Sequence, residues 1–221
     1  MIKDHLKNRT QLIELTNGCP NNCSYCKEET KLTTFAIPKI VKNYVQILDM
    51  NFLYNPNCIN LIKELGLKRV NNKIVYYELV CGLDFRLMSL DIAKLLKKNR
   101  FIKPRIAWDL GLNYQYKIRN CLNQLKRGGF NPKEIMVFIL SNWRVSYYDC
   151  LKKLDLLKIW GVKVGDCYFD NQLSPNIKPI YWLKSDIMDF RTKCRKHNQL
   201  IGFGYDPEYN TLDNKTLIEF R

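Results

Sequence analysis

Short apolar runs alternate with amphipathic helical patterns along most of the chain. Six runs have the length and apolar content of strands: Gln11–Leu15, Tyr44–Leu48, Ile74–Val80, Arg105–Trp108, Glu134–Leu140 and Lys163–Phe169. The fifth, EIMVFIL, is apolar almost throughout, as expected for a strand that is covered on both faces. Strands that alternate with helical patterns predict βα units around a parallel sheet.

The segments between these runs carry signals for helix starts and stops. In NPNCINLIKELG, Asn55 can cap a helix, Pro56 suits its first turn, and Gly66 ends the apolar stripe. Similar patterns predict further helices over about 89–99, 116–129, 146–161 and 186–196. The connection between the first two strands differs, because Pro38 interrupts it and leaves room for a short helix or none.

Six βα units in 221 residues are too few for a closed eight-stranded barrel, which typically needs about 250 residues. We therefore predict an α/β fold, a partial (β/α)6 TIM-like barrel that forms a single domain over residues 1–221. The barrel units are expected to span about 11–200, followed by a C-terminal tail at 201–221. In such folds, active residues collect where the strands end and the following loops begin.

Composition favours a folded protein but says little about its partners. Hydrophobic residues make up 46% of the chain, the N-terminal MIKDHLKNRT lacks an apolar signal region, and no uncharged stretch is long enough for a membrane helix. We therefore expect a cytoplasmic protein with no membrane association. The formal charge of +15 would suit a nucleic acid or a nucleoside, but AT-rich coding DNA would also enrich lysine.

Three of the nine cysteines lie in NGCPNNCSYCKEE, residues 17–29, which we call the cysteine loop. It follows the first predicted strand, and clustered thiolates bind zinc or iron–sulfur clusters. A structural zinc site normally has four ligands, and neither histidine, His5 or His197, stands in a ligand-spaced motif. The other six cysteines are interpreted as small buried hydrophobes: Cys58, Cys81, Cys121, Cys150, Cys167 and Cys194.

The sequence Cys19-Pro-Asn-Asn-Cys23-Ser-Tyr25-Cys26 resembles the C-x-x-x-C-x-aromatic-C signature of radical S-adenosylmethionine (SAM) enzymes. The resemblance implies that the three cysteines ligate a 4Fe-4S cluster, whose fourth iron binds the amine and carboxylate of SAM. It also implies reductive cleavage of SAM to a 5′-deoxyadenosyl radical, which abstracts a hydrogen atom from a substrate. An electron donor such as flavodoxin or ferredoxin would be required. Tyr25 stands where the family's aromatic residue packs near the adenine.

Polar residues after the second and third predicted strands are candidates for binding SAM. Asp49 and Asn51 stand where the family often has a Gly-Gly-Glu stretch, and they can offer acceptors to the methionyl amine. Arg86 suits a carboxylate because its guanidinium binds two oxygens at once, although a surface ion pair with Asp84 is the alternative. The missing Gly-Gly-Glu stretch is a departure from the family's pattern.

The later strand ends supply further candidates. Asp109 and the pair Ser141-Asn142 stand where the family commonly contacts ribose and methionine, and Asp166 and Tyr168 are candidates for the substrate side. The tail has no cysteine and no basic arm, so we expect a minimal core enzyme.

Two other functions remain open alternatives to the radical enzyme. The first is a non-catalytic, zinc-binding, basic nucleic-acid-binding module; the missing fourth ligand and the βα pattern argue against it. The second is a redox carrier or a degenerate binder, which a three-cysteine motif does not favour because a carrier does better with a fully ligated cluster. The sequence identifies neither the substrate nor whether SAM is consumed or regenerated.

Overall fold

The computed structural model describes residues 9–169 and 182–203. All six predicted strands are present, several of them shorter than expected, as β1 (Thr10–Ile13), β4 (Tyr44–Ile47), β7 (Tyr76–Leu79), β8 (Arg105–Ala107), β9 (Met136–Ser141) and β10 (Lys163–Tyr168). Of the expected C-terminal tail, only residues 201–203 are described, and His5 lies outside the described residues.

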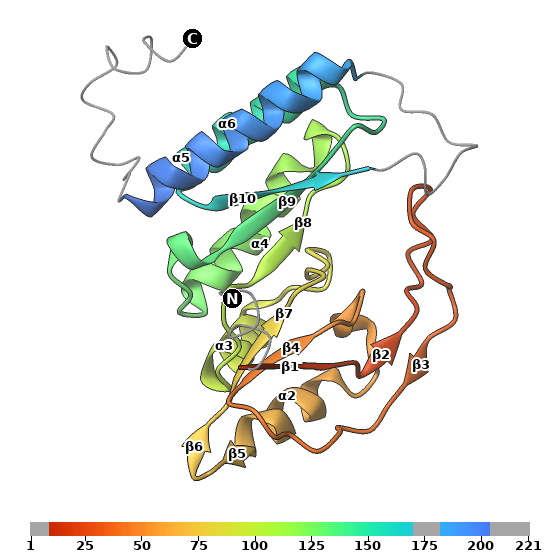
Figure 1. Cartoon of the computed structure of the whole chain (residues 1–221), viewed down its shortest axis with the longest axis vertical. Helices are drawn as coiled ribbons and strands as arrows, with labels where there is room; N and C mark the ends of the chain where they lie inside the picture. The colour runs from red at the N-terminus through yellow and green to blue at the C-terminus, as the bar shows by residue number, and fades with distance from the viewer. Residues whose placement is uncertain (1–8, 170–181, 204–221) are drawn as a thin grey trace.

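The strands form two three-stranded parallel sheets, in the orders β1-β4-β7 and β8-β9-β10. A parallel bridge between Leu83 and Ile106 brings the chain after β7 beside β8, and the Leu83 N–H donates to the Arg105 carbonyl at 2.7 Å. The carboxyl ends of both sheets lie toward the side that carries β2 and β3 (Figure 1). Within the described ranges no strand pairs β1 with β10, so the sheets do not form a closed barrel.

Five helices follow the strands and cover the sheets: α2 (Cys58–Leu67), α3 (Leu90–Lys98), α4 (Gln115–Arg127), α5 (Tyr147–Ile159) and α6 (Lys184–Gly202). Ser89 and Ser146 cap α3 and α5, each accepting a backbone N–H of the first turn. In α2 the helix begins at Cys58 with Asn57 as its N-cap, so the expected start at Asn55 and Pro56 is wrong by two positions. The helix continues one residue past Gly66, so the expected stop is wrong by one position. Residues 18–43 contain no helix, as the interruption by Pro38 allowed, so β1 lacks the helix that a full (β/α)6 arrangement requires.

Two antiparallel hairpins were not predicted. β2 (Thr16–Asn17) pairs with β3 (Thr33–Thr34) and holds the two ends of the cysteine loop together. β5 (Arg69–Val70) pairs with β6 (Lys73–Ile74) through Asn71 and Asn72, which both have positive φ. Ile74 therefore belongs to a hairpin, and not to the third strand as expected. Three short 3-10 turns complete the described elements: η1 (Phe52–Tyr54), η2 (Leu112–Tyr114) and η3 (Pro132–Glu134).

The core lies between the sheets and the helices, and it is built from alternate strand residues such as Val45, Ile47 and Ile106. The residues between them face the other side of each sheet, and the two sheets meet edge to edge at β7 and β8. There the fully enclosed Glu78 carboxylate forms an ion pair with Arg105, whose guanidinium also donates to the Val80 carbonyl at 2.9 Å. This pair joins β7 to β8 where the ladder of backbone hydrogen bonds is interrupted.

None of the helices in the described ranges has both the length and the apolar character required to span a bilayer.

Candidate active site

A cavity of about 600 Å³ lies where the strands of both sheets end, next to the cysteine loop. Its wall includes seven of the predicted site residues: Cys19, Cys23, Tyr25, Cys26, Asn51, Arg86 and Asp109. Four strand ends contribute to it, those of β4, β7, β8 and β9. The position agrees with the expectation that functional groups gather at the carboxyl ends of parallel strands.

The cysteine loop is compact because its backbone closes on itself. The Cys19 N–H donates to the Glu29 carbonyl at 2.7 Å, and the Cys26 N–H donates to the Cys23 carbonyl at 2.9 Å. Gly18 has a φ of +86°, and a Cβ at this position would lie 2.1 Å from the Lys31 carbonyl oxygen. Only glycine fits this close approach.

All three thiols are partly exposed on the cavity wall, and two sulfurs have an N–H donor nearby. The Asn51 Nδ2 lies 3.5 Å from Cys19 Sγ, and the Glu28 backbone N–H lies 3.5 Å from Cys26 Sγ. Such donors stabilise a thiolate. Burial raises the pKa of the Cys23 thiol, and the neighbouring Cys19 and Cys26 thiols raise it further.

The geometry of the thiols does not suit a single zinc ion. In the part of the chain that the structure describes, no three Cys, His, Asp or Glu side chains converge on one ion position. His197 is buried in α6, with its Nε2 2.8 Å from the Val162 carbonyl, so it is not a fourth ligand. A cubane cluster takes each thiolate on a separate iron, so its ligands do not need to meet at one point. Three cysteine thiols are chemically the donors that an iron–sulfur cluster takes, one on each of three irons.

Tyr25 links the cysteine loop to the end of β8. Its hydroxyl donates to Asp109 Oδ2 at 2.6 Å, and its ring meets Trp143 edge-on at 6.0 Å. Burial raises the pKa of Asp109, which the hydrogen bond from Tyr25 and the charge of Lys153 partly counteract. Burial and the adjacent Asp109 carboxylate also raise the pKa of Tyr25, so its hydroxyl keeps the proton that it donates.

Lys153 is a fully buried lysine that faces the same strand end from α5. Its Nζ donates to the Trp108 carbonyl at 2.9 Å and lies 5.2 Å from the centre of the Trp108 ring. Burial lowers the pKa of Lys153 to about 8, although Cys150 and Asp109 oppose the shift. The sequence offered no signal for this residue, because a lysine on an amphipathic helix usually faces solvent.

A polar group from the cysteine loop, β4 and β7 forms another part of the wall. Arg86 Nε donates to Asp84 Oδ1 at 2.8 Å, and Asn21 Nδ2 donates to Asp84 Oδ2 at 2.9 Å. Burial alone would raise the pKa of Asp84, but the hydrogen bonds from Arg86 and Asn21 outweigh it and lower the pKa. Asn51 is 4% exposed, and its Oδ1 has no hydrogen-bond partner among the described residues.

Asp49 and Ser141 do not line the cavity. Asp49 Oδ1 accepts the Leu15 backbone N–H at 2.7 Å, and burial raises the pKa of this carboxyl. The Ser141 hydroxyl donates to Asp166 Oδ1 at 2.9 Å, across the β9–β10 pair. Both side chains hold neighbouring strand ends together.

Three further candidates also have partners away from the cavity wall or lie in solvent. Asn142 donates to the Phe169 carbonyl at 2.9 Å, and Asp166 forms an ion pair with Arg191 at 3.1 Å. Tyr168 is 44% exposed at the end of β10.

Several residues of the cavity wall were not among the predicted site residues, among them Asn21, Cys81, Trp143 and Arg144. The last two directly follow Ser141-Asn142, so their place at a strand end was the signal available in the sequence. The interpretation of the scattered cysteines as buried hydrophobes holds for Cys121, Cys150 and Cys194. It is wrong for Cys58, Cys81 and Cys167, which are partly exposed, and Cys81 lies on the cavity wall.

No protein-family model matches the chain, and no curated protein matches its sequence. A solved structure of the radical S-adenosylmethionine methyltransferase TsrM from Kitasatospora setae, with cobalamin and a 4Fe-4S cluster bound, is similar at a TM-score of 0.60 and 13% identity, over 74% of this chain and 38% of that chain. A second solved structure of TsrM from Kitasatospora setae, with its tryptophan substrate and the SAM analogue aza-SAM bound, is similar at a TM-score of 0.60 and 12% identity. The similarity covers 75% of this chain and 37% of that chain. This chain thus corresponds to less than two fifths of TsrM, and it shares the fold of that part of a radical SAM enzyme.

Proposed function

We propose that this protein is a radical SAM enzyme whose six parallel strands form an open barrel. One observation carries the proposal: Cys19, Cys23 and Cys26 lie on the wall of one cavity at the strand ends of a fold shared with TsrM. A 4Fe-4S cluster held by these thiolates would supply the electron that cleaves SAM to a 5′-deoxyadenosyl radical, for abstraction of a hydrogen atom from the substrate. Flavodoxin or ferredoxin is the proposed electron donor.

The residues of the cavity wall would bind SAM through complementary groups. The Asn51 Oδ1 has no hydrogen-bond partner among the described residues, so it can accept a hydrogen bond from the methionyl amine, and the adjacent Asp84 carboxylate contributes its negative charge. Arg86 is 44% exposed at its side chain and offers its remaining N–H groups to the carboxylate. Asp49 was expected to bind the amine, but its hydrogen bond to Leu15 favours Asn51 for this role.

Aromatic side chains would bind the adenine and limit the access of water. Tyr25 is held by Asp109, and Trp143 is packed against Phe169 with their ring centres 4.3 Å apart. Rings fixed in this way provide a rigid apolar surface, which shields a reactive intermediate from solvent. The amide donors at Asn51 and Glu28 would lower the cost of holding negative charge on the thiolates.

The test is an anaerobic preparation with reconstituted iron and sulfide. We expect about four irons per chain and 5′-deoxyadenosine on addition of dithionite and SAM. Cys23→Ala should lose the iron and keep the circular dichroism of the wild type, whereas Cys58→Ala, away from the cavity, should keep both. An iron-replete, active Cys23→Ala protein would refute the ligand assignment.

The same preparation separates the two alternative functions. Zinc without iron, together with DNA or RNA binding, would favour the nucleic-acid-binding module. A full complement of iron without any 5′-deoxyadenosine would favour a redox carrier or a degenerate binder.

A further inference from the structure

We propose that Arg144 binds an anionic group, a carboxylate or a phosphate, of a small organic substrate with an apolar body. The proposal deepens the function proposed above and rests on it, because it assigns a substrate class to the same cavity. The cysteine motif makes no prediction about Arg144.

Arg144 is held at the cavity by the turn that follows β9. Asn142 has a φ of +59°, and the chain then buries Trp143 while it exposes Arg144. The Trp143 ring is fixed between Tyr25 and Phe169. The Arg144 guanidinium carbon lies 5.3 Å from the centre of the Trp143 ring. A guanidinium held over an aromatic ring keeps its N–H edges free for a planar acceptor, so the group is positioned in advance.

Arg144 is also the arginine of the cavity wall that has no role in the proposed SAM site. The wall contains two arginines, and the guanidinium of Arg86 is already bound to Asp84. Arg144 forms no ion pair with a described carboxylate, including Asp149, which lies on the same cavity wall. A guanidinium in this state can accept a bidentate oxyanion without first losing a partner.

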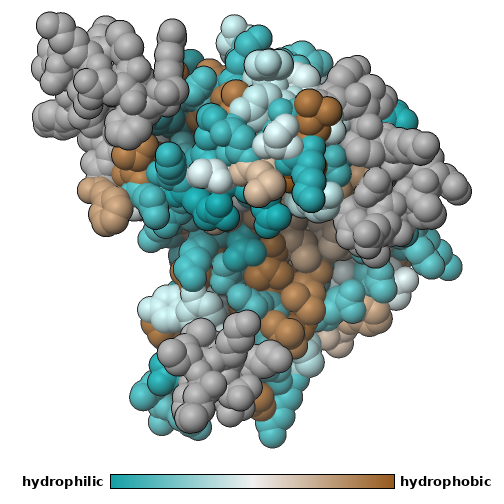
Figure 2. All heavy atoms as spheres, turned by 45° about the horizontal axis from the view of Figure 1, so that its top comes forward, coloured by the Kyte–Doolittle hydropathy of each residue, from teal (hydrophilic) through white to brown (hydrophobic). Residues whose placement is uncertain are grey.

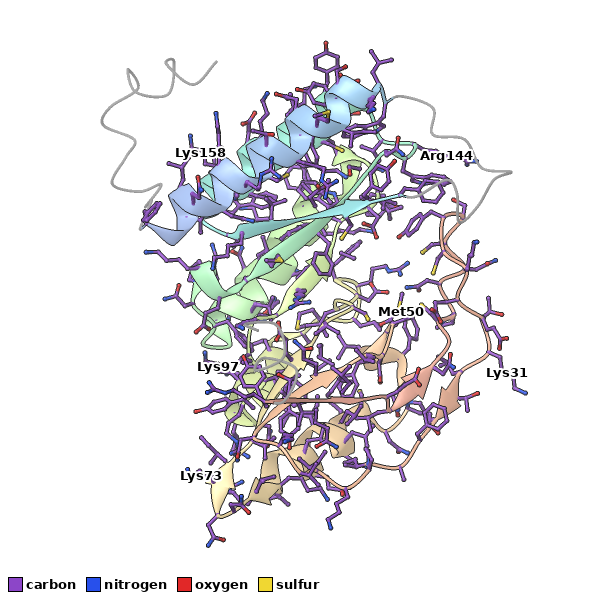
Figure 3. All side chains as sticks on the ribbon, in the orientation of Figure 1. Lys31, Met50, Lys73, Lys97, Arg144 and Lys158 are labelled. Carbon is purple, nitrogen blue, oxygen red and sulfur yellow. The ribbon has the colours of Figure 1, made fainter. Side chains whose placement is uncertain are left out.

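The surroundings of Arg144 specify the rest of the ligand. Met50 and Leu110 also line the cavity, and they are 41% and 38% exposed although both are apolar. Figure 3 shows Arg144 near the end of the β8-β9-β10 sheet and Met50 near the end of the β1-β4-β7 sheet. Figure 2 shows apolar side chains near the centre of the visible face, with polar side chains above and to the left of them. A cavity of about 600 Å³ is of the size that holds small molecules.

The test uses two fluorescent probes with the same apolar body, 8-anilinonaphthalene-1-sulfonate and the uncharged N-phenyl-1-naphthylamine. We expect the wild type to bind the sulfonate more tightly, and Arg144→Gln to weaken sulfonate binding about five- to tenfold while the uncharged probe is unaffected. Arg119→Gln, which removes an exposed arginine of α4, is the matched control for overall charge. Displacement of the sulfonate by phenylacetate or by phenyl phosphate then separates a carboxylate preference from a phosphate preference.

Three results would overturn the proposal. The first is equal affinity of the wild type for the two probes, and the second is equal weakening by Arg144→Gln and Arg119→Gln. The third is a loss of iron or of SAM affinity in Arg144→Gln, measured by equilibrium dialysis, because Arg144 would then belong to the cofactor site. Failure of the proposed function would appear differently, as absent iron or absent 5′-deoxyadenosine in the wild type, whatever the probes show.

Discussion

The hydroxyl of Tyr25 donates a 2.6 Å hydrogen bond to the carboxylate of Asp109, and this contact joins the cysteine loop to the end of β8. The two residues are 84 positions apart in the sequence. Tyr25 stands between two of the three motif cysteines, so a group that fixes Tyr25 also restrains the thiols on either side. The aromatic residue of the motif therefore has a structural role here in addition to any contact with a nucleotide.

Tyr25→Phe should loosen the cysteine loop and destabilise the protein. The substitution removes the donor to a partly buried Asp109 oxygen, which costs about 1 kcal/mol of unfolding free energy. In the metal-free protein we expect Cys23 and Cys26 to react faster with a thiol reagent. Tyr116→Phe, at a tyrosine that is 74% exposed, should change stability by less than about 0.5 kcal/mol. Unchanged thiol reactivity would show that Asp109 does not restrain the loop.

Arg105→Met should be strongly destabilising, since it leaves the Glu78 carboxylate buried without its cation. Breaking a buried pair in this way costs about 3–5 kcal/mol, measured by urea unfolding. The comparison is Lys68→Met, which breaks the exposed pair of Lys68 with Glu64 and should cost less than about 1 kcal/mol. Similar losses in the two variants would mean that the Glu78–Arg105 pair does not hold the sheets together.

Lys153 should make stability depend on pH in the alkaline range. Because burial lowers its pKa to about 8 in the folded protein, against 10.5 as the ordinary value, the unfolded chain binds more protons between these two pH values. The contribution of Lys153 to stability should therefore rise by about 3 kcal/mol from pH 8 to pH 10.5. The measurement is the unfolding free energy of the wild type minus that of Lys153→Met at each pH. The same difference for Lys152→Met, at an exposed lysine, should not change with pH. If neither difference changes with pH, the pKa of Lys153 is not lowered.

Gly18→Ala should disturb the cysteine loop through its backbone. A Cβ at a φ of +86° and 2.1 Å from the Lys31 carbonyl forces the β2–β3 hairpin to move, at a cost of about 1–3 kcal/mol. We expect less iron per chain after reconstitution. Gly202→Ala, where a Cβ meets no atom within 4 Å, should be neutral or slightly stabilising. Full iron loading of Gly18→Ala would show that the loop tolerates the shift.

The elements that could be predicted from the sequence are those with a periodic signal. The run EIMVFIL became β9, and the capped stripe after Ser146 became α5, because buried strands and amphipathic helices repeat their apolar positions. The two-residue strands β2 and β5 have no period to detect. The Asn71-Asn72 pair was the available cue for one hairpin, since asparagine tolerates positive φ.

The site could be predicted only as far as local spacing carried the information. Cys19, Cys23 and Cys26 are fixed by a short motif, and Asp109 by its place at a strand end. Whether Asp49 or Asn51 faces the cavity depends on how the chain turns after β4, which residue type alone does not determine. Arg144 was missed for the same reason, because the left-handed backbone of Asn142 decides which of the following side chains is buried.

The arrangement of two short sheets has a consequence for how such a protein can adapt. The loop that carries the thiols is attached to the β1-β4-β7 sheet, and the turn that carries Trp143 and Arg144 follows β9 of the other sheet. The spacing between the two groups therefore depends on the junction around Arg105. Substitutions at this junction can widen or narrow the cavity without changing any side chain on its wall. Variants selected to accept a bulkier substrate are therefore expected to accumulate there as often as at the cavity wall.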